Sequence, residues 1–315
     1  MQARGPDHAE ATGNGTLDVV TGSFSYSGSA VTRRLLAAGR QVRTLTGHPD
    51  RAPLDTPVEV RPLDFADPAA LTDSLRGAHT LYNTYWVRFA RGPLDHATAV
   101  ANSRTLFQAA REAGVQRIVH VSITHPDPDS PYPYFRGKAQ VEQALAGTGV
   151  PHTVLRPAVL FGGDGVLINN IAWLLRRLPV FAVGGSGRYR VRAVHVDDLA
   201  RLCVEAGART GDEVLDAVGP DRPTFEQLVR AVAAAVGSRS LVVRVPGAAL
   251  PPLSALLGAV LRDSLLTADE YRAMADGLAD TEGPATGRIS LQQWLTEHRA
   301  VLGLRYANEL QRHFR

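Results

Sequence analysis

Residues 17–28, LDVVTGSFSYSG, decide the fold of this 315-residue chain. Their first half is a short β-rich run that ends in glycine, and their second half is a turn rich in serine and glycine. An amphipathic helix over 29–38, a closing Gly39 and a second strand over 41–46 follow. This strand–turn–helix–strand order predicts the opening of a parallel, doubly wound sheet.

The same alternation continues through the first half of the chain, and a glycine closes most of the helices. The fold class is therefore α/β: a Rossmann-type doubly wound parallel sheet with a smaller, mostly helical C-terminal substrate lobe. We expect further strands at 58–63, 79–84, 117–122 and 152–155, and helices at 68–75, 96–113 and up to residue 145.

The regular alternation of strands and helices ends after Arg156-Pro157, where glycines, prolines and short segments dominate. We divide the chain into a disordered leader (1–16), a dinucleotide-binding core (17–157) and the remaining core elements plus the substrate lobe (158–315), all in one integrated unit. Elements expected in the last part are helices at 167–178, from 195 and at 224–236, a strand at 214–217, and two or three helices after 264, the last basic and amphipathic over 302–315.

Composition limits the function classes. The net charge of +3 is spread over scattered arginines and does not predict a nucleic-acid partner. The one cysteine, Cys203, leaves no intrachain disulfide and suits a reducing cytoplasm. The most apolar stretch, 248–261, is too short to cross a bilayer and predicts a packed helix or a partner contact. We expect a small-molecule substrate, a cytoplasmic protein without a metal site, and a monomer or homodimer.

The turn over 21–28 lies where the pyrophosphate of a dinucleotide would meet backbone N–H groups and the positive end of a helix. Gly22 and Gly28 would allow the tight turn and a close approach of the backbone. Ser25, between Phe24 and Tyr26, stands where the G-x-x-G-x-x-G pattern has its middle glycine, and its hydroxyl can bind a phosphate oxygen. The alternative is a loop without a ligand, but its place between strand and helix favours NAD(P) binding.

The choice of cofactor depends on the end of the second strand. That strand ends Leu45-Thr46-Gly47-His48, without the acidic residue that reads the ribose 2′-hydroxyl of NAD. This favours NADP over NAD, with Arg43, His48 or Arg51 at the 2′-phosphate, unless all three are ordinary surface residues. Further cofactor contacts are expected after the third and fourth strands, from Asp64, Phe65, Asn83 and Thr84.

Tyr134 and Lys138 are spaced Y-x-x-x-K, and Lys138 is the only lysine among 34 basic side chains. At i and i+4 the two side chains share one face of a helix, whereas Tyr132 lies off that face. There the ammonium can lower the pKa of the phenol, which would make Tyr134 an acid or a base near neutrality. The alternative is a chance spacing with a solvated lysine.

These features together resemble the short-chain dehydrogenase/reductase superfamily in its extended and atypical branches. The second half looks most like NAD(P)-binding epimerase/dehydratase-type proteins and relatives of the respiratory complex I accessory subunit. The likeness runs from about Val19 to Leu202, and its further motifs are Asn102, 122–124 (SIT), 155–157 (LRP), 160–162 (LFG), 169–170 (NN), 184–189 (GGSGRY) and 194–198 (VHVDD).

The resemblance implies a role for each matching position. Thr124 would bind the substrate oxygen, with Ser122 as the runner-up. Tyr134 would be the general acid or base, and Lys138 would hold the ribose hydroxyls of the cofactor. Pro157 would help to shape the nicotinamide pocket.

Two departures from the family pattern bear on the reaction. His125-Pro126 follows Thr124 in place of the acidic pair of sugar-nucleotide dehydratases, which argues against a dehydratase. Only nine residues separate Thr124 from Tyr134, so the substrate loop is shorter than in sugar epimerases. By contrast, Asn102 agrees with the family pattern, because it matches a structural asparagine of the superfamily.

The loop at 85–91, YWVRFAR, would overhang the nicotinamide. Its aromatic rings can stack on a substrate ring, and its arginines can pair with an anion such as a carboxylate or a phosphate. The alternative is that Trp86 and Phe89 pack under the second lobe. The candidate substrate contacts are Tyr85, Trp86, Arg88, His125 and Asn169.

The leading interpretation is an NAD(P)-dependent oxidoreductase or epimerase that acts at a carbinol or carbonyl carbon through Thr124, Tyr134 and Lys138. One alternative is a non-catalytic NAD(P)-binding redox sensor or assembly subunit. Another is a cofactor-assisted rearrangement in a biosynthetic pathway. The intact phenol–ammonium pair favours the enzyme, because a pure binding protein has no need of it.

Overall fold

The computed structural model describes residues 15–53, 55–89, 95–163 and 165–308, so residues 1–14 of the expected leader lie outside it. Its centre is a seven-stranded parallel sheet in the order β3-β2-β1-β4-β5-β6-β10. This is the Rossmann order with one further strand, which confirms the predicted doubly wound sheet. The strands are β1 (Leu17–Thr21), β2 (Gln41–Thr46), β3 (Glu59–Pro62), β4 (Ala78–Asn83), β5 (Arg117–Val121), β6 (His152–Pro157) and β10 (Glu213–Ala217).

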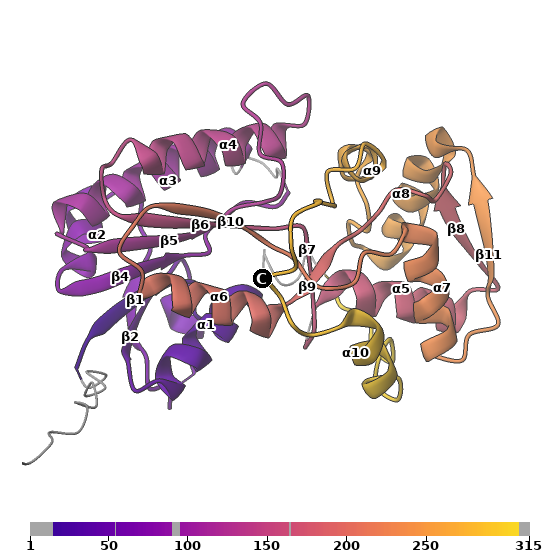
Figure 1. The fold of residues 1–315 in the computed structure, drawn as a ribbon, viewed down its shortest axis with the longest axis horizontal. Helices are drawn as coiled ribbons and strands as arrows, with labels where there is room; N and C mark the ends of the chain where they lie inside the picture. The colour runs from indigo at the N-terminus through magenta and orange to yellow at the C-terminus, as the bar shows by residue number, and fades with distance from the viewer. Residues whose placement is uncertain (1–14, 54, 90–94, 164, 309–315) are drawn as a thin grey trace, which may run out of the picture.

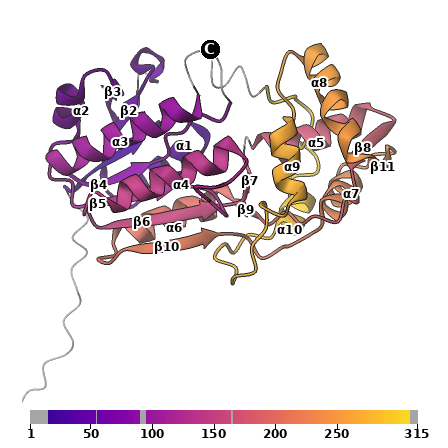
Figure 2. The same ribbon diagram turned by 90° about the horizontal axis from the view of Figure 1, so that it is seen from above.

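Helices cover both faces of the sheet, as Figures 1 and 2 show. The neighbours Val19 and Val20 of β1 belong to different buried clusters, and both are fully buried. A parallel strand covered on both faces is apolar on both sides, which explains the continuous apolar runs of the sequence. The helices are α2 (Pro68–Leu75), α3 (His96–Glu112) and α4 (Pro133–Ala146) on one face, and α1 (Tyr26–Ala37) and α6 (Val196–Gly207) on the other.

Side-chain caps decide where the helices near the site begin. The Ser25 hydroxyl accepts a hydrogen bond from the Gly28 N–H, so α1 begins at Tyr26, one turn before the expected residue 29. Asp95 caps α3 by accepting from the Thr98 N–H. Helix α4 begins at Pro133, because proline suits the first turn of a helix.

Apart from α6 and β10, the chain after β6 builds a second lobe at the carboxyl ends of the strands, to the right in Figure 1. Two parallel strand pairs, β7–β9 and β8–β11, belong to it. Its elements are β7 (Val159–Phe161), α5 (Val166–Arg177), β8 (Val180–Gly184), β9 (Ala193–His195), α7 (Phe225–Ala235), β11 (Leu241–Val245), α8 (Leu250–Leu261), α9 (Ala268–Ala275) and α10 (Leu291–Glu297), and short 3₁₀ helices lie at Pro49–Arg51 and Gly247–Ala249.

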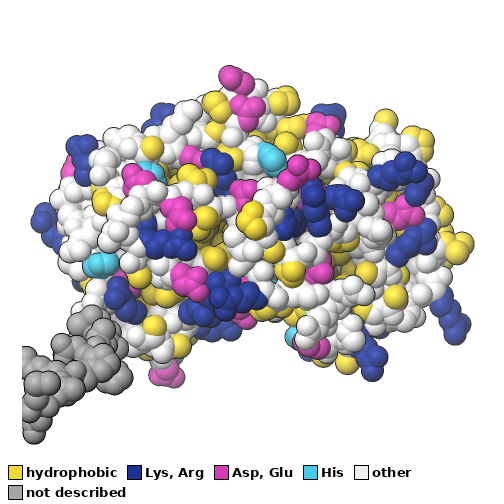
Figure 3. All heavy atoms as spheres, in the orientation of Figure 1, with side chains coloured by type: hydrophobic (Ala, Val, Ile, Leu, Met, Phe, Trp, Pro, Cys, Tyr) yellow, Lys and Arg dark blue, Asp and Glu magenta, His cyan; other side chains and the backbone are white. Residues whose placement is uncertain are grey.

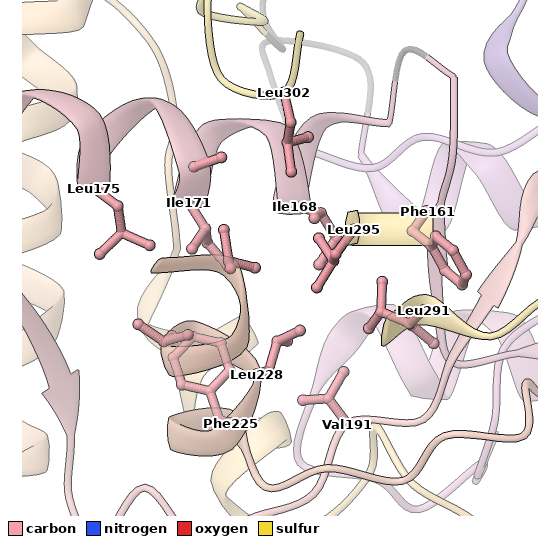
Figure 4. Close-up of a cluster of buried hydrophobic side chains, with 14 of the residues drawn as sticks. Phe161, Ile168, Ile171, Leu175, Val191, Phe225, Leu228, Leu291, Leu295 and Leu302 are labelled. Carbon is pink, nitrogen blue, oxygen red and sulfur yellow. The ribbon is translucent and has the colours of Figure 1, made fainter. Parts of the chain in front are cut away.

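The second lobe has its own apolar core, in which side chains of α5, α7 and α10 point toward one another (Figure 4). Ile168, Leu228 and Leu295 are each at most 2% exposed there. Burying one such side chain contributes about 1.5–3 kcal/mol, so this cluster holds the lobe together.

One expected element is wrong. Residues 301–304 form turns and not the start of a helix over 302–315, and residues 309–315 lie outside the described chain. Gly303 has a φ of +70°, which leaves the helical region, and its N–H donates to the Asn169 side chain. Leu302 is buried in the core of the second lobe, so the tertiary contact decides the local conformation.

The surface carries both signs of charge. On the face drawn in Figure 3, acidic and basic side chains are interspersed. Within the described ranges, every helix falls short of the length and apolarity needed to cross a membrane.

Candidate active site

Two glycines build the turn between β1 and α1. Gly22 has a φ of +70°, a conformation that only glycine adopts without steric cost. A Cβ atom on Gly28 would lie 2.1 Å from the Gly22 carbonyl oxygen, so no larger residue fits there. The turn is therefore shaped by these two residues and ends at the positive N-terminus of α1.

A cavity of about 1740 Å³ lies beside this turn, between the sheet and the second lobe. A pocket for one drug-sized ligand has about 300–1,000 Å³, so this cavity has room for a dinucleotide and a second molecule. The predicted site residues that line it are Phe24, Ser25, Tyr26, Thr84, Trp86, Arg88, Ser122, Tyr134, Lys138 and Pro157.

Asn83 supports the site from behind and is fully buried. Its Oδ1 accepts hydrogen bonds from Thr21 Oγ1 (3.1 Å) and from the Tyr85 N–H (3.0 Å), and its Nδ2 lies 3.0 Å from His120 Nδ1. The hydroxyl of Thr84 donates to the Thr21 carbonyl (2.6 Å). These bonds tie the ends of β1, β4 and β5 together under the cavity.

Asp64, Phe65 and Tyr85 are among the predicted contacts that lie outside the wall of the cavity. Asp64 is exposed and accepts a hydrogen bond from the Ala66 N–H (2.9 Å). Phe65 packs against Tyr85 with 4.9 Å between ring centroids, and the Tyr85 hydroxyl accepts from Asn102 Nδ2 (2.8 Å). The Tyr85 phenol is therefore engaged with α3 and does not face the substrate region.

The candidates for a 2′-phosphate contact are reduced to two. Arg43 forms an ion pair with Glu59 (2.8 Å) and donates to two backbone carbonyls at the end of α2. His48 is exposed after β2, and the side chain of Arg51 lies outside the described part of the structure. Arg43 is thus engaged elsewhere.

Lys138 is buried in the cavity wall. Its Nζ donates to the Val121 carbonyl (2.9 Å) and lies 4.5 Å from the centroid of the Trp86 ring. Burial lowers the pKa of Lys138 to about 7, and the carboxylate of Glu142 only partly offsets this effect.

Tyr134 lies on the same wall, but its pKa moves in the direction opposite to our expectation. Burial raises the pKa of the phenol to about 12; the charge of Arg88 lowers it and that of Glu270 raises it. Trp86 contacts both residues: its ring lies edge-on to Tyr134, with 5.5 Å between centroids, and faces the ammonium of Lys138. The expectation that Lys138 lowers the pKa of Tyr134 is therefore wrong here, because burial dominates.

The low pKa of Lys138 predicts a pH-dependent stability. Its folded pKa of about 7 lies below the ordinary value of 10.5, so between these values the unfolded chain binds more protons. The free energy of unfolding, compared with that of Lys138→Met, should rise from pH 7 to pH 10 by a few kcal/mol at most, at about 1.4 kcal/mol per pKa unit. Urea titrations of both proteins at several pH values measure it; a pH-independent difference would contradict the burial of an ionisable amine.

The structure reverses the order in which the sequence ranked Thr124 and Ser122 as the hydroxyl that faces the substrate. The Thr124 hydroxyl is buried and donates to the Leu278 carbonyl (2.7 Å), and Thr124 is not part of the cavity wall. Ser122 lines the cavity, and its hydroxyl oxygen is buried without a hydrogen-bond partner. Ser122, the runner-up in the sequence, is therefore the hydroxyl residue that shares the cavity with Tyr134.

Helix α9 and the chain after it cover the cavity. Side chains of the sheet half bind this covering segment. The Tyr132 hydroxyl donates to Asp276 Oδ2 (2.5 Å), and Arg88 pairs with Glu270 (3.2 Å). Burial and the bond to Asp276 raise the pKa of Tyr132 to about 12. The Tyr132 phenol therefore binds the covering segment through Asp276, which leaves Tyr134 as the phenol for chemistry.

His125 and Asn169 lie away from the large cavity. His125 has a φ of +52°, and its Nε2 lies 2.5 Å from the Asp280 carbonyl beside a smaller cavity of about 410 Å³. The Asn169 amide donates to the Arg305 carbonyl (2.8 Å) and its oxygen accepts from the Gly303 N–H (3.1 Å). His125 therefore binds the chain at Asp280, and Asn169 binds it at 303–305.

Among the residues of the wall that were not predicted, two contact the predicted site residues Trp86 and Arg88. His96, the first residue of α3, stacks on Trp86 with 5.8 Å between ring centroids and 7° between ring planes. Glu270 pairs with Arg88 across 182 residues of sequence. The pattern Thr267-x-x-Glu270 is a capping box and could have located the start of α9, but no local signal pairs Glu270 with Arg88.

The residues present fit a dinucleotide. Residues 24–27 of the turn line the cavity at the N-terminus of α1, where the positive end of the helix can receive a pyrophosphate. Ser122 adds a buried hydroxyl without a partner. Over the described residues, no group of three His, Cys, Asp or Glu side chains is close enough to hold a metal ion.

Comparisons with known proteins agree with this geometry. Residues 21–210 match the family described as NAD(P)H-binding. The chain is 28% identical over 247 residues to the ceramide reductase of Caulobacter vibrioides, covering 76% of this chain and 77% of that one. It is 25% identical over 223 residues to the 40 kDa subunit of mitochondrial NADH-ubiquinone oxidoreductase from Neurospora crassa, covering 70% of this chain and 58% of the subunit.

Among solved structures, the triphenylmethane reductase of Citrobacter sp. complexed with NADP(H) has the same fold. The TM-score is 0.74 at 21% identity, and the match covers 90% of this chain and 99% of the reductase. These findings confirm the predicted resemblance, including the branch of the respiratory complex I accessory subunit. The chain belongs to the NAD(P)H-binding family of Rossmann-fold proteins.

Proposed function

We propose that this chain is an NAD(P)H-dependent oxidoreductase that reduces a carbonyl group of a small molecule to a carbinol. The observation that carries the proposal is that Ser122, Tyr134, Lys138 and residues 24–27 of the glycine-rich turn line one and the same cavity. Relatives that are named reductases support it. A bound dihydronicotinamide would supply the hydride.

In this proposal Tyr134 gives its proton to the carbonyl oxygen. A phenol with a pKa of about 12 stays protonated at neutral pH, which suits a proton donor. Epimerisation requires the same group to remove a proton first, so the raised pKa favours reduction. Ser122 would donate a hydrogen bond to the same oxygen, and Lys138 would bind the ribose hydroxyls after releasing the Val121 carbonyl.

The proposed cofactor is NADP(H). No acidic residue ends β2, and His48 and Arg51 follow that strand. A guanidinium and an imidazole after this strand would favour a 2′-phosphate over a hydroxyl.

A non-catalytic NAD(P)-binding subunit is the second candidate, and the position of Trp86 favours it. The Trp86 ring faces the ammonium of Lys138 and contacts Tyr134, so the phenol and the amine do not form a hydrogen bond. The likeness to a subunit of a respiratory complex agrees with this reading. Measured turnover separates the two candidates. An enzyme would need the hydroxyls of Ser122 and Tyr134, whereas a non-catalytic subunit would bind the cofactor without either of them.

Removing the Ser122 hydroxyl tests the proposal. Ser122→Ala should lower kcat about a hundredfold in NADPH-coupled reduction of a ketone, as the loss of a hydrogen-bond donor to a developing oxyanion does. Its thermal stability should not fall, because the hydroxyl has no partner to lose.

Thr124→Ala is the matched control. It should lower the free energy of unfolding by about 1 kcal/mol, because the part-buried hydrogen bond to the Leu278 carbonyl is lost, and it should largely retain kcat. If Thr124→Ala abolishes turnover in a folded protein while Ser122→Ala does not, the assignment of the hydroxyl is wrong.

A further inference from the structure

The half of the cavity that the second lobe encloses is largely apolar, and its polar side chains are Ser264, Thr267, Asp269 and Glu270. Side chains from β7, α5, the segment after α8, and α9 with the chain that follows it form its wall there. Its apolar residues include Leu160, Leu167, Leu265, Leu266, Met274 and Leu278. A ligand in this half gains free energy mainly by burying apolar surface.

The cations of the wall are already engaged. Arg88 pairs with Glu270 through Nη2 (3.2 Å) and Nε (3.4 Å), both to Oε1. Over the described part of the wall, the other lysine and arginine side chains have partners too: Arg33 with Asp197, Arg136 with the Ser130 carbonyl and Lys138 with the Val121 carbonyl.

Glu270 is held in place by its own helix. Its Oε2 accepts hydrogen bonds from the Thr267 N–H (2.9 Å) and the Thr267 hydroxyl (3.0 Å), which complete the capping box of α9. An anionic ligand that approached Arg88 would meet this fixed carboxylate and would have to displace it. Arg88, Glu270 and Tyr134 line the same cavity, so a substrate whose carbonyl group meets Tyr134 binds in the cavity that this ion pair faces.

We propose that the site selects an uncharged, largely apolar carbonyl compound and rejects carboxylated or phosphorylated ones, because Glu270 neutralises the cation that faces the substrate. The inference rests on the proposed function. It replaces our expectation that Arg88 pairs with an anion of the substrate.

Three ketones of similar size test it: acetophenone, para-acetylbenzamide and para-acetylbenzoate, with NADPH as reductant. The wild-type protein should reduce acetophenone with a kcat/KM at least about a hundredfold above that of the benzoate, because the carboxylate would lose its hydration without gaining a free cation as its partner. The neutral amide should lie much closer to acetophenone, which separates charge from size.

Glu270→Gln is the decisive variant, because glutamine preserves the capping box and removes the charge. It should raise kcat/KM for para-acetylbenzoate about tenfold or more. Glu112→Gln is the matched control: it removes a carboxylate of α3 that lies outside the wall of the cavity and accepts a hydrogen bond from Gln108 Nε2 (2.7 Å), and it should leave the preference unchanged.

Equal use of acetophenone and para-acetylbenzoate by the wild-type protein would overturn the inference, as would a Glu270→Gln variant that still rejects the benzoate. Thermal shifts of the NADP-loaded protein with each ketone separate this inference from the proposed function. Stabilisation by acetophenone but not by the benzoate, without turnover of either, supports the charge selection and overturns the reductase. Stabilisation by the benzoate alone, or by neither, overturns the charge selection.

Discussion

Tyr134→Phe is expected to lower kcat by about 10²–10⁴-fold, the usual contribution of a positioned general acid, while the affinity for NADPH stays near that of the wild type. The change removes only the hydroxyl, which has no hydrogen bond to another residue in the described structure, so the fold should be retained. Steady-state kinetics with a saturating ketone and a fluorescence titration of NADPH measure the two quantities.

Tyr189→Phe is the control for the loss of a phenolic hydroxyl. The Tyr189 hydroxyl is buried without a partner in the second lobe, away from the wall of the cavity. Its removal should leave turnover and stability nearly unchanged. If Tyr132→Phe abolishes kcat and Tyr134→Phe does not, the proton donor has been assigned to the wrong phenol.

Gly28→Ala is expected to raise the dissociation constant of the dinucleotide at least about a hundredfold and to lower the free energy of unfolding by about 1–3 kcal/mol, the usual cost of overpacking. The added Cβ would lie 2.1 Å from the Gly22 oxygen and 2.8 Å from its carbon, both backbone atoms that cannot move without opening the turn. Calorimetric titration with NADPH and thermal unfolding check the two effects.

Gly211→Ala is the corresponding control. An added Cβ on Gly211 would meet no atom within 4 Å, and the residue lies outside the wall of the cavity. It should bind NADPH as the wild type does. Normal binding by Gly28→Ala would show that the turn does not hold the pyrophosphate.

Most of the sheet could be predicted from local patterns. Strand β2 and helix α2 have the predicted bounds, because an apolar period and flanking glycines mark each of them. The pair β8–β11 was missed. Its Val180 and Leu241 are 44% and 67% exposed, so no buried alternation marks either strand.

The candidate site was harder to predict because contacts across the chain arrange it. Ser122 and Thr124 are two residues apart and look equivalent in the sequence; the Leu278 carbonyl, 154 residues later, engages one hydroxyl and leaves the other. Burial decides the direction in which both pKa values shift: it raises the pKa of Tyr134 and lowers that of Lys138. A spacing of Y-x-x-x-K predicts the shared face but not the dielectric around it.

The most direct test of the central claim is the transfer of deuterium from NADPH that carries deuterium at both positions of C4 of the dihydronicotinamide. With acetophenone as substrate, mass spectrometry of the alcohol should find one deuterium on the carbinol carbon for the wild-type protein, and Tyr134→Phe should form the same labelled product far more slowly. Unlabelled alcohol, or a protein that binds NADPH tightly and reduces none of the three ketones, would contradict the assignment of this cavity as the active site of a carbonyl reductase.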